Sequence, residues 1–356
     1  MALPGLDAKN TVSYVIREEG RYRLLDAFGD WEGVARMALD LANSDRLEAA
    51  RAWLDRAREE LQQGPAQDPL SPPLFARVWT KGQNGDRTAI RRAAAVLLAS
   101  EAEDAATVPI LLEAYQSAQR ADERQVFASA LCGAYMKAKD YARAVDLATS
   151  VLKEAPQSTA AFTLAVEAAS KAGDRGRTEQ LAAEYLEKFN TDAVALRAAA
   201  VAMLTVGANE RAAAILATLT GSGRAEAKDY NLIVWSHLMN SSITEATTAA
   251  IQQAMLLSKG EEPGILHTVA AIQAETGKPG QARVTILQRM DLSGSEQPDD
   301  DDWYVFGRIA EQYALPDVAK DMYAKLARPK DESLVRMSSY ALAQRRLEVL
   351  NKAAGK

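Results

Sequence analysis

The sequence is poor in the residues that build disulfide frameworks, metal centres and aromatic cores. It has one Cys and two His among 356 residues, and aromatic residues make up only 6% of the chain. A single Cys excludes an intrachain disulfide framework and a Cys-based structural zinc site. Two His residues are too few for a multi-His metal centre without help from carboxylates. We therefore expect no metal site and no cofactor.

Signatures of catalysis are missing as well. The chain has no Gly-x-Ser-x-Gly elbow, no Walker A loop, no Gly-x-Gly-x-x-Gly after a strand and no His-Glu-x-x-His, and no convincing strand stands out. The net charge of -6 and the pI near 5.3 argue against a nucleic-acid partner. The longest apolar stretch, residues 193–208, contains Arg197 and is shorter than the ~18–20 apolar residues of a membrane span. These absences predict a protein that is not an enzyme, binds no nucleic acid and does not insert into a membrane.

The first residues do not resemble a secretory signal, because they lack a basic region followed by an apolar one. This predicts a cytoplasmic location if the chain is complete. A periplasmic or envelope location follows instead if the chain is a fragment of a larger exported protein. Nothing in the sequence defines an oligomeric state.

A regular spacing of helix-breaking turns is the strongest positive signal. The chain has 69 Ala residues, which favour helix. Its length alone suggests two or three domains, but a repeat architecture would override that estimate. Successive turns lie 34, 34, 34, 36 and 37 residues apart, at Lys139, Gly173, Gly207, Ser241, Gly277 and Ala314. The spacing predicts repeated pairs of helices, and the Gly residues at these turns permit positive φ at the end of the first helix.

Two further sets of residues repeat at the same intervals. Small residues, which let the two helices of a pair cross closely, recur at Ala144, Thr178, Ala212, Ala246, Ala282 and Ala319. Bulky residues near the start of the first helix recur at Phe162, Leu196, Tyr230, Leu266 and Trp303. Agreement of three registers over six units predicts one elongated solenoid.

A 34-residue helix-turn-helix unit resembles the tetratricopeptide (TPR) repeat. The last unit carries the residue types of that family at Trp303, Gly307, Ala310, Ala319 and Tyr323. The resemblance implies an all-α fold, a TPR-type α-solenoid in which the repeats form a right-handed superhelix with a concave groove.

A weaker resemblance is to the helical C-terminal region of large bacterial envelope proteins that carry a transglutaminase-like domain. It rests on segments such as residues 31–33, 265–268 and 303–313. It would make this chain the helical accessory region of a larger enzyme.

The repeat pattern divides the chain into three parts. Residues 1–90 are predicted to be a helical N-terminal section with one divergent helix pair and a Pro-rich linker at 64–73. Residues 91–332 are predicted to form the TPR solenoid, with about seven helix pairs. Residues 333–356 are predicted to supply a capping helix over 334–352, which would cover the last apolar face of the solenoid.

The TPR resemblance also implies which residues face the groove. The function it predicts is a non-catalytic scaffold that binds a peptide or protein segment there, and Trp, Tyr and Arg are typical of binding hot spots. The predicted partner-binding residues are Lys171, Arg197, Lys228, Asn231, Trp235, His267, Tyr304, Arg308 and Gln312. Asn231, His267 and Tyr304 share one repeat position and should form a ladder along the groove.

Two other classes of function remain open from the sequence. The first is an all-helical enzyme or carbohydrate-binding protein that uses the groove carboxylates Glu167, Glu275 and Glu311, since glycoside hydrolysis needs two suitably spaced acids. The second is a regulator with DNA-binding helices near Arg91 and Arg92, against which the balanced charge argues.

Overall fold

The structure is a computed structural model, and it forms two compact units, Met1–Glu154 and Ala155–Lys356. It describes residues 13–18, 21–27, 31–63, 75–76, 78–79, 86–101, 107–118 and 120–354. The predicted Pro-rich linker at 64–73 lies outside these residues. The boundaries predicted at residues 90 and 332 differ from this division and stay a prediction.

The first unit begins with a β-hairpin. Strands β1 (Ser13–Glu18) and β2 (Arg21–Ala27) pair antiparallel, with Arg17 opposite Tyr22. The expectation that the chain has no strand is therefore wrong. Residues 14–16 and 22–25 are mostly aromatic, β-branched or Leu, which are types that favour strands or tolerate them well. Two strands of six and seven residues are too short to stand out beside a repeat signal of 34 residues.

The described residues of the first unit then form six helices. They are α1 (Trp31–Asn43), α2 (Leu47–Gln63), α4 (Arg87–Glu101), α5 (Val108–Ser117), α6 (Ala121–Lys137) and α7 (Tyr141–Glu154). Each packs on its neighbour in sequence, and α1 also packs on α4. Trp79 is fully buried and donates its indole N–H to Asp55 at 2.9 Å.

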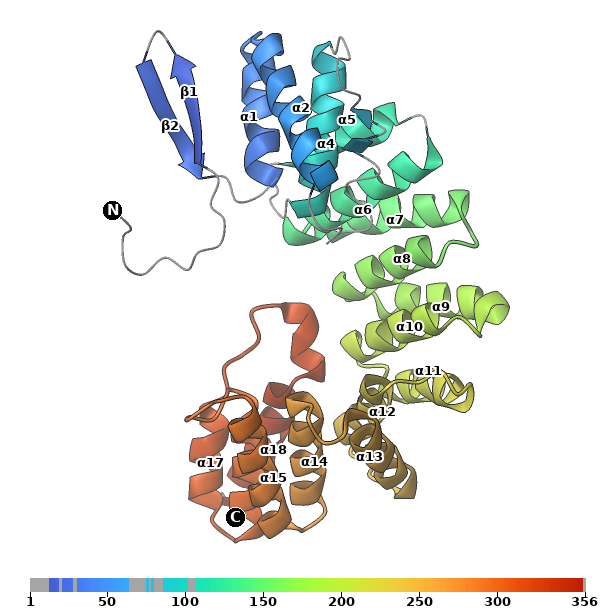
Figure 1. Cartoon of the computed structure of the whole chain (residues 1–356). Coiled ribbons are helices and arrows are strands. Elements are labelled where there is room, and N and C mark those ends of the chain that lie inside the picture. The colour runs from blue at the N-terminus through green and yellow to red at the C-terminus, as the bar shows by residue number, and fades with distance from the viewer. Residues whose placement is uncertain are drawn as a thin grey trace. The chain divides into compact units, whose positions relative to one another are not determined.

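The second unit is a stack of helix pairs (Figure 1). In each pair we call the first helix A and the second B. The pairs are α8 (Thr159–Lys171) with α9 (Arg175–Phe189), α10 (Ala193–Thr205) with α11 (Asn209–Gly221), α12 (Ala227–Met239) with α13 (Glu245–Ser258), α14 (Pro263–Glu275) with α15 (Pro279–Leu292), and α16 (Asp302–Gln312) with α17 (Pro316–Ala324). A helices also pack on the A helices of neighbouring pairs, as in α8 on α10 and α14 on α16. In the second unit the predicted TPR-type α-solenoid is confirmed.

The turn between the A and B helices is the most regular feature of the repeat. All six predicted turn residues have positive φ, between 54° at Ser241 and 75° at Gly207 and Gly277. The next residue donates its N–H to a carbonyl five positions back, as Asp174 does to Ala169 at 3.1 Å. This bond satisfies a carbonyl that the ending helix leaves unpaired.

The small-residue register is confirmed in five of its six positions. Ala144, Thr178, Ala212, Ala282 and Ala319 are fully buried. Ala246 is exposed instead, and the neighbouring Thr247 is fully buried. Helix α13 begins four residues after Ser241, whereas α11 begins two residues after Gly207. The longer turn shifts the buried face of α13 by one position.

The C-terminal end differs from the single helix predicted over residues 334–352. A 3-10 helix, η2 (Glu332–Met337), comes first, and α18 (Ser339–Ala354) begins after an extended Ser338. The Ser338 hydroxyl accepts a hydrogen bond from the N–H of Ala341 at 3.4 Å, which helps to start α18. Helix α18 packs on α16 and α17 and buries Leu342 and Ala343 there.

Candidate partner-binding surface

The C-terminal ends of three successive A helices form one surface in the second unit. Lys171 of α8, Thr205 of α10 and Met239 of α12 occupy the same repeat position, 34 residues apart. We call this the helix-end surface, and its members are Lys171, Thr205, Val206, Gly207, Trp235 and Met239.

A segment of the same chain lies on the helix-end surface. The C-terminal segment, residues 331–338, contains η2, and Figure 1 shows this red turn beside α10. Asp331 forms an ion pair with Lys171, Nζ to Oδ2 3.8 Å. At its other end the Met337 carbonyl accepts a hydrogen bond from Trp235 Nε1 at 2.6 Å, and Thr205 Oγ1 lies 3.8 Å from Met337 Sδ. The segment thus crosses from α8 over α10 to α12.

Two arginines reach main-chain carbonyls at the ends of A helices. Arg336 Nη1 donates to the carbonyl of Val206 at 3.4 Å, and Arg345 Nη1 of α18 donates to that of Met239 at 2.7 Å. The last carbonyls of a helix are unpaired and carry the negative end of its dipole, so a cation is favoured there. The helix-end surface therefore offers a lysine at one end and carbonyl acceptors along the rest.

The contact is shallow. No residue of η2 is buried, and Leu334 is 47% exposed. Trp235 is half-buried, and its ring centroid lies 6.0 Å from that of His267. The pKa of Asp331 is lowered by hydrogen bonding to Ser333, with a smaller contribution from Lys171. Polar contacts, with little apolar burial, hold the C-terminal segment in place.

The structure places the predicted groove residues in different surroundings. Lys171 and Trp235 contact the C-terminal segment. Lys228 is exposed beside Glu226, and Gln312 is exposed at the end of α16. Arg197 makes two bonds of 2.8 Å to the fully buried Asp229, so it joins α10 to α12.

Three of the predicted groove residues are buried. His267, Tyr304 and Arg308 are only 8%, 1% and 7% exposed. His267 lies 3.1 Å from the carbonyl of Asp301, and Arg308 makes two bonds of 2.7 and 2.9 Å to Glu275. The expectation that these three side chains face an open groove is wrong. Each of these side chains is covered by other groups of the protein, which lie where a partner would otherwise contact it.

Asn231 is the remaining predicted residue, one turn before Trp235 on α12. Its Oδ1 atom is buried and has no hydrogen-bond partner among the described residues. Two of the three members of the predicted ladder, His267 and Tyr304, are buried. The role of the ladder in partner binding stays a prediction.

A buried polar network joins four helices around Arg308. Tyr304 donates to Glu275, and Arg308 bridges Glu275 and Glu311, the latter at 2.9 Å. Tyr323 of α17 and Arg346 of α18 also donate to Glu311. Burial by itself would raise the pKa of Glu311, but its bonds to Arg346 and Tyr323 and the charge of Arg308 hold that pKa below its ordinary value. Burial and the charge of Glu275 raise the pKa of Tyr304.

These contacts bear on the two other functional classes. Glu275 and Glu311 are both bonded to Arg308, and the pKa of Glu311 is lowered, whereas a general acid needs a raised pKa. Arg91 bonds to Glu113 at 2.6–3.2 Å, and Arg92 pairs with Glu123, so neither guanidinium is free for DNA phosphates. The described residues contain no group of three or more His, Cys, Asp or Glu placed to hold a metal ion.

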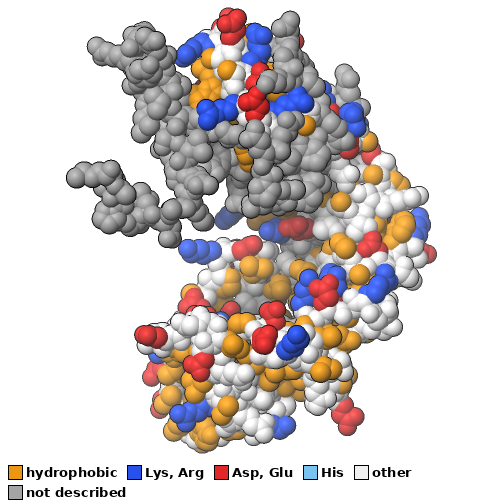
Figure 2. All heavy atoms as spheres, in the orientation of Figure 1, with side chains coloured by type: hydrophobic (Ala, Val, Ile, Leu, Met, Phe, Trp, Pro, Cys, Tyr) orange, Lys and Arg blue, Asp and Glu red, His pale blue; other side chains and the backbone are white. Residues whose placement is uncertain are grey.

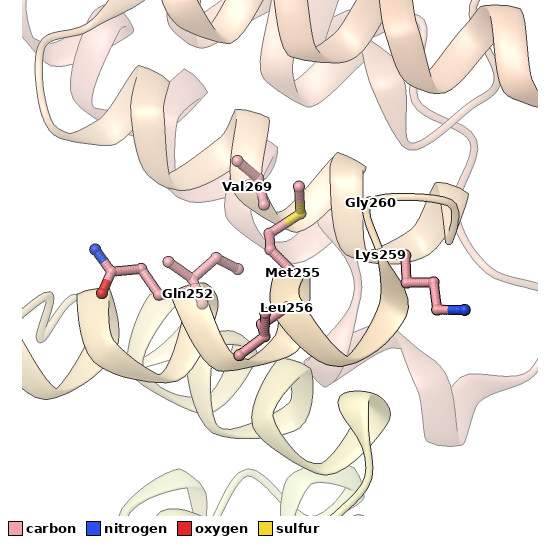
Figure 3. Close-up of a pocket in the computed structure, with 7 residues that line it drawn as sticks. Gln252, Met255, Leu256, Lys259, Gly260 and Val269 are labelled. Carbon is pink, nitrogen blue, oxygen red and sulfur yellow. The ribbon is translucent and has the colours of Figure 1, made fainter.

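A second hollow lies between α13 and α14. Its wall is mostly apolar and includes Ile251, Met255, Leu256 and Val269, with Lys259 at the rim (Figure 3). Leu256 is 70% exposed. Figure 2 shows further hydrophobic side chains over the C-terminal helices, and Val284 and Leu287 of α15 are exposed there.

Sequence reasoning missed most of the helix-end surface. Val206 and Met239 act through their main-chain carbonyls, which no side-chain pattern reveals. The one available signal is the repeat itself, because Lys171, Thr205 and Met239 share a position. Pro329, which precedes the C-terminal segment, also indicates that no helix continues from α17.

Comparisons with known proteins give distant likenesses only. No family model and no curated protein matches the chain. Among solved structures it is similar to the APC/C hetero-tetramer Cut9-Hcn1 (TM-score 0.46, 9% identity), covering 92% of this chain and 58% of that one. It is also similar to a tetratricopeptide repeat protein from Parabacteroides merdae (0.41, 12% identity, covering 90% and 98%) and to a Rap protein complexed with Competence and Sporulation Factor (0.40, 13% identity, covering 91% and 97%).

At these TM-scores the likenesses carry no argument, so the fold assignment rests on the chain's own helix pairs and turns. Among the described residues, no helix is both long and apolar enough to cross a membrane.

Proposed function

We propose that this protein is a non-catalytic scaffold that binds a segment of another protein on the A-helix side of its solenoid. The observation that carries the proposal is the C-terminal segment, which lies across three A helices and bonds to Lys171 and Trp235. A surface that holds a segment of its own chain has the donors, acceptors and shape that a segment in trans requires.

The chemistry of the surface favours binding over catalysis. Trp235 offers an indole N–H beside an apolar ring, a combination common in interface hot spots. Of the three carboxylates that could serve an enzyme, Glu275 and Glu311 pair with Arg308 and Arg346. Glu167 pairs with Lys171 at 3.9 Å. A helical accessory role within a larger enzyme is compatible with the same binding surface.

The test is a selection of displayed peptides on the full-length protein. Enriched peptides should bind the wild type and lose binding to the Trp235→Ala variant. The Lys188→Ala variant is the control, because Lys188 is exposed near the end of α9 and makes no contact with the C-terminal segment among the bonds described. Circular dichroism must be unchanged in both variants. The proposal fails if no peptide is enriched, or if the peptides bind the Trp235→Ala variant as well as the wild type.

A further inference from the structure

The C-terminal segment has the properties of a replaceable ligand. Among the bonds described, it makes one ion pair, at 3.8 Å, and three hydrogen bonds to the helix-end surface, at 2.6 and 3.4 Å and, to the Met337 sulfur, at 3.8 Å. It buries no residue of η2. Helix α18, by contrast, is anchored by Leu342, Ala343 and the bond of Arg346 to Glu311. The anchors of the solenoid cap therefore lie outside the C-terminal segment, which can leave while the cap remains in place.

We propose that residues 331–338 are a built-in occupant of the helix-end surface, and that the partner is a short protein segment with the same order of chemical groups. This inference rests on the proposed function. The partner segment displaces residues 331–338 when it binds.

Charge complementarity defines the partner. Lys171 at one end of the surface requires an acidic residue, as Asp331 supplies. The carbonyl of Val206 at the end of α10 favours a cation, as Arg336 supplies five positions later. Trp235 then donates to a main-chain carbonyl, and Thr205 contacts an apolar or thioether side chain. Met337 supplies both groups. The partner segment is thus acidic at its start, basic five positions later and Met-like six positions later.

The tether makes the occupant an effective competitor. A short covalent connection gives a binding segment a local concentration on the order of 1 mM. If the free segment binds with a Kd of about 0.1 mM, the ratio of occupied to unoccupied surface with the tethered copy is roughly ten to one. An external segment consequently meets a surface that is about tenfold less available in the wild type than in a protein that lacks the occupant.

The test uses a linker variant, in which Gly and Ser replace residues 331–337 at equal length and Ser338 and α18 are kept. A fluorescent peptide of residues 331–338, DESLVRMS, is titrated against the full-length proteins and followed by anisotropy. We expect saturable binding to the linker variant, binding at least tenfold weaker to the wild type, and loss of binding when Trp235→Ala is added to the linker variant. The linker variant must keep the helical circular dichroism of the wild type.

A scrambled peptide of the same composition controls for non-specific charge attraction. The inference is overturned if the peptide does not bind the linker variant at millimolar concentration, or if it binds the wild type and the linker variant equally. These failures differ from failure of the proposed function. If selected peptides need Trp235 but bind the wild type and the linker variant equally, the scaffold function stands and the built-in occupant does not.

Discussion

The Arg308→Met variant tests whether Arg308 is a structural residue or a groove contact. Methionine keeps most of the side-chain volume and removes the charge. Arg308 is 7% exposed and donates two bonds to Glu275 and one to Glu311. Without it, Glu311 keeps Arg346 and Tyr323, whereas Glu275 keeps only Tyr304.

Breaking a buried ion pair by removing one partner costs about 3–5 kcal/mol. We expect a destabilisation of about 3 kcal/mol for Arg308→Met, at the lower end of this range. Glu275 keeps one hydrogen-bond donor, Tyr304, and its side chain is 19% exposed to solvent. Hydrogen exchange measured by mass spectrometry should show protection in α14 and α16 reduced by about 100-fold. The exposed Lys228→Met variant is the control, with an effect within about 0.5 kcal/mol. If Arg308→Met leaves protection unchanged and abolishes only peptide binding, Arg308 is a contact residue and our interpretation of the network is wrong.

Three further predictions concern the solenoid. In Gly307→Ala, the new Cβ would lie within 2.7 Å of the Tyr323 ring, so we expect about 1–3 kcal/mol of destabilisation by overpacking in urea unfolding; no change would refute the close packing of α16 on α17. In Ala314→Gly, relief of the positive φ of 57° should raise stability by about 1 kcal/mol, and a lower melting temperature would contradict the strain argument. The lowered pKa of Glu311 contributes stability above its ordinary pKa that is lost as the pH falls through the folded value. The Glu311→Gln variant should therefore have a lower melting temperature than the wild type at pH 7, and its melting temperature should fall less as the pH is lowered. An equal fall in the two proteins would exclude this role of Glu311.

The repeat could be predicted because it depends on local rules. Each A helix must end in a turn with left-handed backbone, so the spacing of Gly173, Gly207 and Gly277 was enough to place the helix pairs. Ala246 was misplaced because two extra residues in a turn rotate the following helix, which no count from turn to turn can reveal.

The site was harder to predict because it depends on contacts distant in sequence. Tyr304 and Arg308 occupy positions that face outward in the repeat pattern, but Glu275 from the preceding pair covers them. Trp235 was found from its type and position, whereas its partner, the carbonyl of Met337, lies 102 residues away. A repeat pattern specifies which face a residue occupies, but it does not specify what folds back onto that face.

The most direct test of whether residues 331–338 occupy the helix-end surface is the NMR signal of the Trp235 indole N–H, because this group donates to the carbonyl of Met337. A ¹H–¹⁵N spectrum resolves the indole signals of the five Trp residues, and the Trp235→Phe variant assigns the one that matters. We predict that this signal shifts in the linker variant and returns toward its wild-type position as the DESLVRMS peptide is added. A signal that is the same in the wild type and the linker variant, or that the peptide leaves unmoved, would contradict the account.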